Sequence, residues 1–363
     1  MTKKQKVFVG VSGGVDSSVA LALLKEQEYD VTGVFLKVWY PDWMPCDWKE
    51  ERRSAMRVCA TLGVAHITLD CQAEYKKEVV DYMIREYSLG RVPNPDIFCN
   101  KYVKFGVFLK KALEMGADFV ATGHYAQVVN NKGVFELQES VDKNKDQSYF
   151  LYTLDQYQLI HTLFPVGGMT KGEVRKLAKK FGLPTAEKKD SQGLCFIGKV
   201  DMKDFLSHYI SAKKGNVLNT KGEIVGEHDG AMFLTIGQRH GFTITKKSSD
   251  DPRFFVISKD LIKNTITIAN KESESEDIYS TKEIIVPNLH FISPRQRLGL
   301  GGSFDAMVRI RYRQEKQDCV VEKKSDGYHI IFKNPQNGIA VGQSAVIYDD
   351  EVCLGGGIIE RTE

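Results

Sequence analysis

The chain of 363 residues contains no apolar run near the ~18 residues that a membrane-spanning helix needs. Its longest apolar runs, Val7–Val11 and Val19–Leu24, have the length of ordinary strand or helix segments. The basic start at Met1–Lys6 leads into an apolar stretch too short for a secretory signal, so we expect no targeting peptide and a cytoplasmic location. Hydrophobic residues at 42% and charged residues at 27% exclude a mainly disordered chain, a collagen-like fibre and a coiled coil.

The seven cysteines form no C-x-x-C pair, and their spacing matches no zinc or iron–sulfur pattern. We therefore expect no metal cluster held by the protein, and a disulfide framework would be unusual in a cytosolic chain of this length. Most of the cysteines are expected to be buried thiols. Five of them lack polar, glycine-rich or proline-rich surroundings, and we interpret these as packing residues: Cys46, Cys59, Cys71, Cys319 and Cys353.

The length indicates more than one domain, because a globular domain holds about 100–200 residues. The first 125 residues alternate strand and helix patterns, whereas short β runs separated by turns follow from about Gly215. We predict an α/β fold in three parts: a parallel-sheet domain over residues 1–205, a small mixed central domain over 206–280 and a C-terminal β-barrel over 281–363.

Two local patterns follow the parallel-sheet region. Ala126–Val129 and Val134–Leu137 predict a hairpin. A helix is predicted to begin with the capping box formed by Thr170 and Glu173 and to end at Gly182.

The strongest motif stands between a predicted strand and a predicted helix, in the first of the loops at the carboxyl edge of the sheet. It consists of Gly10, Val11, Ser12, Gly13, Gly14, Val15, Asp16, Ser17 and Ser18. It has no lysine and is neither G-x-x-x-x-G-K-[ST] nor G-x-G-x-x-G. Its glycines let the backbone approach a ligand, and the following helix points its N–H groups at an anion. The motif resembles the PP-loop of enzymes that cleave ATP between the α- and β-phosphates. Its acidic Asp16, beside the expected polyphosphate site, suggests Mg²⁺.

Two cysteines have unusual surroundings. Cys99 follows Pro93 and Pro95, and a helix is expected to start near Asp96, which would cap it and share a helical face with Cys99. Cys195 lies between two glycines and downstream of two lysines, where a lowered thiol pKa is plausible. Taken alone, each cysteine also fits a buried structural thiol.

Seven segments stand in an order that closely resembles the tRNA-specific 2-thiouridylases, from about residue 5 to the end of the chain. They are Gly10–Ser18, Gly90–Phe105, Ala121–Ala126, Lys143–Leu151, Lys189–Gly198, Thr235–Arg239 and Cys353–Ile359. S-G-G-V-D-S is shared with GMP synthetases and other relatives. P-N-P-D-x-x-C-N-K and D-S-Q-G-x-C-F-I-G are not, so the resemblance is specific.

The resemblance implies sulfur transfer to C2 of the wobble uridine in tRNAs for lysine, glutamate and glutamine. ATP would occupy Gly10–Ser17, with Leu36 and Gly123 near the nucleotide, and would adenylate the C2 oxygen. Cys195 would carry a persulfide from a cysteine desulfurase or a relay protein. The terminal sulfur of this persulfide, or sulfide released from it with help from Cys99, would attack C2. Cys99 would end in a disulfide with Cys195, with AMP and pyrophosphate released.

The resemblance also implies contacts with the substrate. Asp96 would be the acid/base, with Asn94, Pro95 and Asp96 around a flipped-out base, because a base must leave its stack to react. Contacts with tRNA are expected at His124, Lys145, Asp146, Gln147, Arg311, Tyr312 and Gln343. From the residues alone, the alternating Arg309, Arg311 and Arg313 also fit the solvent face of a strand, and His124 also fits an ordinary loop histidine.

Other readings and departures stay open. The same ATP loop would serve an amidotransferase or ligase such as a GMP synthetase relative, or a nucleotide-sensing or RNA-binding module. Many members of the resembling family have methionine where this chain has Leu36, and the sequence after Arg239 lacks the usual glycine-rich continuation. Val38–Trp48, with three tryptophans, has no functional explanation and is treated as a possible lid or contact surface.

Overall fold

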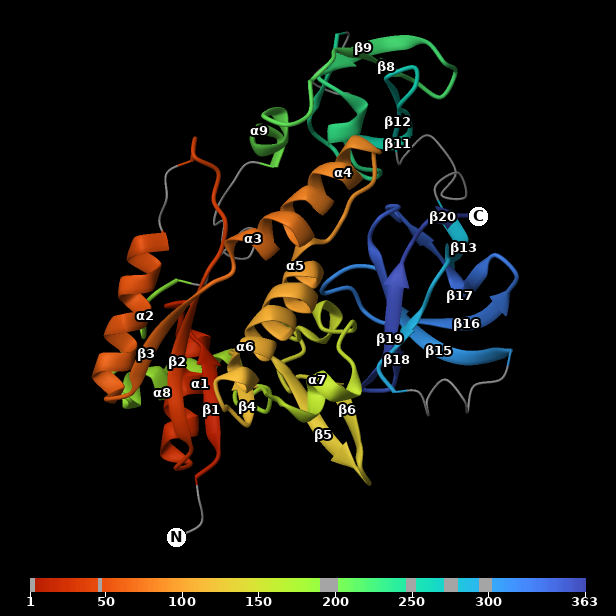
Figure 1. Cartoon of the computed structure of the whole chain (residues 1–363). Helices are drawn as coiled ribbons and strands as arrows, with labels where there is room; N and C mark the ends of the chain where they lie inside the picture. Colours follow the sequence, from red (N-terminus) through yellow and green to blue (C-terminus); the bar gives the residue numbers. More distant parts are fainter. Residues whose placement is uncertain (1–3, 45–47, 190–201, 246–252, 271–279, 294–301) are drawn as a thin grey trace.

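The N-terminal part is built on a parallel sheet whose strand order reverses at its centre (Figure 1). The computed structural model describes residues 4–44, 48–189, 202–245, 253–270, 280–293 and 302–363. The sheet order is β3-β2-β1-β4-β7. The strands are β1 (Lys6–Gly10), β2 (Asp30–Lys37), β3 (Ala65–Asp70), β4 (Phe119–Ala121) and β7 (Thr162–Leu163). Later strands lie on opposite sides of β1, so the crevice between β1 and β4 is the place where such sheets bind ligands.

The side chains of β1 alternate between two cores, as the two-residue period of a strand requires. Val7 and Val9 face a core shared with α1 (Val15–Glu26), α2 (Trp48–Leu62) and α8 (Lys171–Lys180), whereas Phe8 belongs to a second core. The predicted capping box is confirmed, since Thr170 and Glu173 exchange both bonds at the start of α8. Gly182 follows the helix with φ +61°, a conformation that glycine adopts without strain.

The second core lies beneath a chain of short helices that includes two π-helical stretches, η1 and η2. These helices are α3 (Gln72–Tyr75), η1 (Lys76–Asp81), α4 (Tyr82–Ser88), α5 (Pro95–Phe98), η2 (Cys99–Phe108) and α6 (Leu109–Glu114). Helix α5 begins at Pro95 with Asn94 at the N-cap, so the expectation that Asp96 caps it was wrong. Proline suits this first position because it has no N–H to leave unpaired. Cys99 is the first residue of η2, and π-helical segments are frequent at functional sites.

The central part is a small mixed sheet in the order β10-β9-β8-β12-β11. Its strands are β8 (Gly215–Leu218), β9 (Ile224–His228), β10 (Phe242–Ile244), β11 (Phe254–Asp260) and β12 (Thr265–Asn270). Two short helices accompany them, α9 (Met202–Ser207) and η4 (Ala231–Phe233). Val217, Ile266 and Ile268 are central to its separate small core.

The C-terminal part is an antiparallel, barrel-like sheet in the order β20-β13-β17-β16-β15-β18-β19-β6-β5, with β14 paired to β19. Its own strands are β13 (Ser280–Val286), β14 (His290–Phe291), β15 (Ser303–Arg309), β16 (Gln317–Lys324), β17 (Gly327–Asn337), β18 (Ser344–Asp349), β19 (Val352–Ile358) and β20 (Arg361–Thr362). The predicted α/β class with a mixed central and a barrel-like C-terminal part is confirmed. The numerical domain boundaries stay a prediction.

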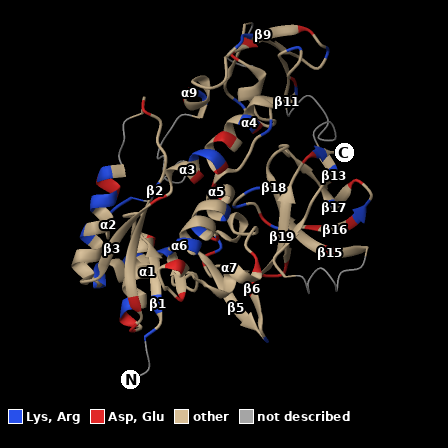
Figure 2. Cartoon of the chain, viewed as in Figure 1, with Lys and Arg blue, Asp and Glu red and all other residues tan. Residues whose placement is uncertain are grey.

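The predicted hairpin forms, and it joins a sheet that its position in the sequence did not indicate. Strands β5 (Ala126–Asn131) and β6 (Val134–Glu139) pair with each other, and β6 also pairs with β19 through Leu137↔Cys353. The N-terminal part therefore supplies two strands of the C-terminal sheet. Charged residues of both signs are prominent along helices such as α2 and α4 (Figure 2). Among the helices that the structure describes, none has the length and apolar character of a membrane span.

A buried ionic cluster, which we call the junction cluster, connects these two parts. It consists of Glu139, Asp146, Arg309 and Lys316. The guanidinium of Arg309 lies 2.8 Å from a carboxylate oxygen of Glu139 and 2.6 Å from one of Asp146. Lys316 Nζ lies 3.1 Å from the other oxygen of Glu139. Both carboxylate side chains are 1% exposed, and Arg309 is buried rather than on the solvent face that alternation suggested.

Replacing Arg309 by methionine is expected to lower the free energy of unfolding by about 3 kcal/mol, because Asp146 would stay buried without its cationic partner. Urea unfolding followed by circular dichroism measures the change. Lys333→Met on β17 is the matched control, since Lys333 is 73% exposed and pairs with Asp318 at 3.7 Å. Equal stability of the two variants would contradict a structural role for the cluster.

Candidate active site

The phosphate-loop motif forms a tight turn between β1 and α1 at the reversal point of the sheet. Gly13 has φ +75°, and a Cβ atom there would lie 2.8 Å from the carbonyl oxygen of Glu51, so a side chain does not fit. Ser17 Oγ accepts a hydrogen bond from the Ser12 N–H at 3.3 Å and lies 3.3 Å from Ser12 Oγ. Gly14 is the N-cap of α1 and no described side chain caps the helix. A helix start without a side-chain cap is the arrangement that anion-binding helices use.

The residues expected around the nucleotide come together at this edge. The loop after β4 presses against the start of α1, because a Cβ at Gly123 would lie 2.5 Å from the Ser17 nitrogen. Leu36, in β2, is 5% exposed and faces the second core. The Val11 N–H donates to Val34 at 2.8 Å and extends the β1–β2 pairing into the loop. The structure therefore gathers the predicted nucleotide residues, and their binding role stays a prediction.

Asp16 has partners that the sequence did not indicate. Lys171, at the start of α8, places its Nζ 2.6 and 2.9 Å from the two carboxylate oxygens of Asp16. The Tyr125 hydroxyl donates to the same carboxylate at 2.8 Å. Lys188 Nζ donates to the Gly13 carbonyl at 3.0 Å. These lysines are more than 150 residues from the loop, so no local pattern could have found them.

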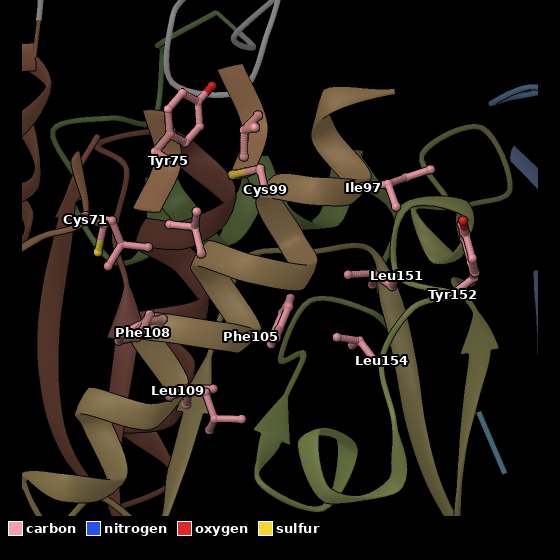
Figure 3. Close-up of a cluster of buried hydrophobic side chains, with 14 of the residues drawn as sticks. Cys71, Tyr75, Ile97, Cys99, Phe105, Phe108, Leu109, Leu151, Tyr152 and Leu154 are labelled. Atoms are coloured by element: carbon pink, nitrogen blue, oxygen red, sulfur yellow. The ribbon is translucent and has the colours of Figure 1, made fainter. Parts of the chain in front are cut away.

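The segment with Cys99 packs over the carboxyl ends of β2 and β3. Cys99 is 1% exposed and belongs to the core that contains Leu36 and Cys71. Its sulfur points toward the side where Tyr75 and Cys71 lie (Figure 3). Gln343, on the loop before β18, donates to the Val92 carbonyl at 2.7 Å and so holds the approach to the Asn94–Asp96 segment. Gln343, expected to contact tRNA, is thereby a link between the C-terminal part and the cysteine segment.

Asp96 is half-buried in α5, one turn before Cys99. Asn94 and Pro95 precede it and are half-buried as well. Cys195 and Cys46 lie outside the described residues. The distance between Cys99 and Cys195 is therefore not described either. The roles assigned to these residues stay predictions.

His124 is buried and neutral. Its Nε2 lies 3.2 Å from Lys104 Nζ, and its Nδ1 lies 2.7 Å from Thr122 Oγ1. Burial, and secondarily the charge of Lys104, hold the pKa of His124 well below its ordinary value. Because an ammonium group only donates, Nε2 accepts and Nδ1 carries the proton. The expected tRNA contact would therefore involve an imidazole already engaged on both nitrogens.

The two segments expected to contact tRNA lie next to each other. The Asp146 carboxylate accepts a hydrogen bond from Ser148 Oγ at 2.8 Å and pairs with Arg309. Asp146 therefore stabilises the loop that contains it from its buried side. Gln147 Oε1 accepts from the Tyr125 N–H at 3.0 Å. Lys145, which precedes them in the chain, is half-buried. Beyond β15, Arg311 is exposed, and the Tyr312 ring lies 4.5 Å from that of Phe150 in η3 (Ser148–Phe150).

The remaining described cysteines are packing residues, as predicted. Burial raises the pKa of Cys59 and Cys71 to about 11 and that of Cys319 to about 12. It raises the pKa of Cys353 further still. These thiols stay protonated near neutral pH and are poor nucleophiles.

Comparison with known proteins covers nearly the whole chain. Family models described as tRNA methyl transferase HUP domain, tRNA methyl transferase PRC-barrel domain and aminomethyltransferase beta-barrel domain match residues 5–199, 203–270 and 281–359. The protein named tRNA-specific 2-thiouridylase MnmA from Pseudomonas paraeruginosa is 43% identical over 99% of this chain and 96% of its own length. The proteins of that name from Stutzerimonas stutzeri and Enterococcus faecalis are each 44% identical with the same coverage.

The parallel sheet with a phosphate loop at its reversal point, followed by two β domains, defines an enzyme of the HUP class with appended barrel domains. Within that class, the chain belongs to the family of tRNA-specific 2-thiouridylases, MnmA.

His124 is expected to stay neutral between pH 6 and 8, since its pKa lies well below 6.5. In the unfolded chain it is protonated below about 6.5, so its burial contributes stability that is present above that pH and decreases as the pH falls. Imidazole nitrogen chemical shifts measure its titration directly. Acid unfolding supplies a second readout: His124→Asn should lose less stability than the wild type between pH 7 and 5. A His124 signal that titrates near pH 6.5 would contradict this assignment.

Proposed function

We propose that this protein replaces the C2 oxygen of the wobble uridine by sulfur in tRNAs for lysine, glutamate and glutamine, in the cytoplasm. One observation carries the proposal: the Cys99 segment and the phosphate loop are positioned at the same carboxyl edge of the parallel sheet. A thiol beside a nucleotide loop suits sulfur transfer to an adenylated substrate. The full-length relatives named 2-thiouridylases support the same activity.

ATP is the proposed activating substrate. The uncapped start of α1 and the glycine turn would hold its phosphates, with Leu36 and Gly123 beside the nucleoside. Mg²⁺ carried with ATP takes phosphate oxygens, water and one or two carboxylates. Asp16 would serve as such a ligand by exchanging Lys171, whose Nζ lies 2.6 and 2.9 Å from its two carboxylate oxygens. Within the described ranges, no group of three acidic, histidine or cysteine side chains is placed to hold a metal by itself.

The proposed reaction has two steps. The uridine O2 attacks the α-phosphorus of ATP, and pyrophosphate leaves. The terminal sulfur of a Cys195 persulfide then attacks C2, the C2–oxygen bond breaks, and AMP leaves. The Cys99 thiolate attacks the inner sulfur, so that the terminal sulfur stays on the base and a Cys99–Cys195 disulfide remains, which an external reductant returns to two thiols. A cysteine desulfurase or a relay protein renews the persulfide.

The surroundings of Cys99 set a condition for this mechanism. Cys99 is 1% exposed, so its attack on Cys195 requires that bound tRNA uncovers the thiol. We assign Asp96 as the acid/base and Asn94, Pro95 and Asp96 as the surroundings of the flipped base. Contacts with the rest of the tRNA are assigned to His124, Lys145, Asp146, Gln147, Arg311, Tyr312 and Gln343.

Cys99→Ala and Cys195→Ala are each expected to abolish thiouridine formation while leaving tRNA binding unchanged, because each thiol is consumed once per turnover. Purified protein is assayed with ATP, Mg²⁺, a persulfide donor and unmodified tRNA, and the product is detected by its retardation in a mercury gel. Cys319→Ala, in the C-terminal sheet, is the control and keeps full activity. Full activity of either of the first two variants would refute the mechanism. Pyrophosphate release that depends on ammonia and yields no thiouridine would favour an amidotransferase.

Ser12→Ala and Asp16→Ala are expected to slow pyrophosphate release about tenfold or more, since each removes a polar group from the phosphate loop. Persulfide loading of Cys195 should be unaffected, because it needs no nucleotide. Loading is followed by mass spectrometry of the intact protein. Wild-type rates of pyrophosphate release in both variants would remove the nucleotide assignment.

A further inference from the structure

The phosphate loop has no lysine of its own, yet two lysines from distant segments reach it. In the G-x-x-x-x-G-K-[ST] loop, a lysine within the motif reaches the β- and γ-phosphates. Here Lys171 Nζ binds both carboxylate oxygens of Asp16, at 2.6 and 2.9 Å. Lys188 Nζ donates to the carbonyl of Gly13 at 3.0 Å. Two ammonium groups thus lie against the two residues that frame the phosphate turn.

The position of Lys171 is fixed by several independent contacts. It is the first residue of α8, directly after the Thr170 capping box. Its backbone N–H donates to Asp142 at 2.9 Å, and α8 packs against α1 in a shared core. Its side chain is 13% exposed and lies over the Tyr125 ring. A long cationic side chain held this firmly needs little ordering when a ligand arrives.

The negative charge of Asp16 is compensated by Lys171. Its carboxylate lies in the first turn of α1, where the phosphates of a nucleotide would bind, and an uncompensated carboxylate there would repel them. The ammonium of Lys171 neutralises this carboxylate, the Tyr125 hydroxyl orients it, and the ammonium of Lys188 at Gly13 adds a second positive charge. The start of α1 therefore stays attractive to an anion.

We propose that Lys171 and Lys188 together take the place of the missing loop lysine and stabilise the negative charge that develops on the pyrophosphate leaving group. As the bond between the α-phosphorus and the bridging oxygen breaks, that oxygen gains charge, and preorganised cations there lower the barrier. This inference rests on the proposed cleavage of ATP between its α- and β-phosphates, and it does not depend on which acceptor is adenylated. The assignment separates Lys171 from the other lysines of α8 and adds Lys188, which lies beyond the end of that helix.

The other lysines of α8 do not contact the phosphate loop in the structure; they pair with other residues or are exposed. Lys179 pairs with Glu187 at 2.9 Å and Lys180 with Glu26 at 3.8 Å, both on the outer surface. Lys176 is exposed on the same helix, near Glu173. A change at Lys176 alters the net charge of α8 as a change at Lys171 does, without touching the phosphate loop, which makes it the matched control.

The test uses the full chain and inorganic pyrophosphate, with and without Mg²⁺, in titration calorimetry. Lys171→Gln and Lys188→Gln should each raise the Kd for pyrophosphate about tenfold, because each removes a charge-assisted hydrogen bond. Lys171→Arg should recover part of the affinity, because it retains a cationic donor. Lys176→Gln should bind like the wild type. Pyrophosphate release with ATP and tRNA should slow in parallel, in kcat more than in KM for tRNA.

Thermal unfolding distinguishes a catalytic role from a structural one. If Lys171→Gln lowers the unfolding temperature but keeps wild-type affinity for pyrophosphate, Lys171 only supports the fold and the inference is refuted. If Lys176→Gln weakens binding as much as Lys171→Gln, a diffuse charge effect replaces it. Failure of the wild type to form thiouridine would instead count against the proposed function, because pyrophosphate affinity is measured without tRNA.

Discussion

The close approach of two backbone segments at the reversal point of the sheet is the constraint on which the site depends. The loop after β4 lies so near the first turn of α1 that Gly123 has no room for a side chain. This contact fixes the spacing between the loop after β4 and the first turn of α1, the turn from which Asp16 emerges. A parallel sheet can place chemistry from β2, β3 and β4 at one edge because all its strands end there.

Local patterns in the sequence predicted the parts of the fold that neighbouring residues determine. The glycine turn of the phosphate loop, the capping box at Thr170 and the β5–β6 hairpin each depend on a few adjacent residues, and each is present in the structure. The N-cap of α5 was misplaced by two residues, because Asp96 is as typical of an N-cap as the Asn94 that occupies the position.

Features that depend on residues far apart in the sequence could not be predicted. Alternation suggested an exposed Arg309, but two carboxylates from the N-terminal part make a buried guanidinium favourable. Lys171 has the sequence context of an ordinary first-turn residue, and only the packing of α8 on α1 brings it to Asp16. The π-helical turn at Cys99 likewise has no signature in the residue pattern. The resemblance to a family predicted the roles of individual residues, and the structure shows which residues they contact.

The hairpin shared between the N-terminal part and the C-terminal sheet makes the two parts depend on each other. Strand β19 covers β6, so a chain ending at residue 280 would present β6 as an open edge with unsatisfied backbone groups, the kind of surface that recruits foreign strands into aggregates. The barrel is therefore no detachable accessory. Without the barrel, another element would have to cover that edge of β6, so the two parts depend on each other structurally.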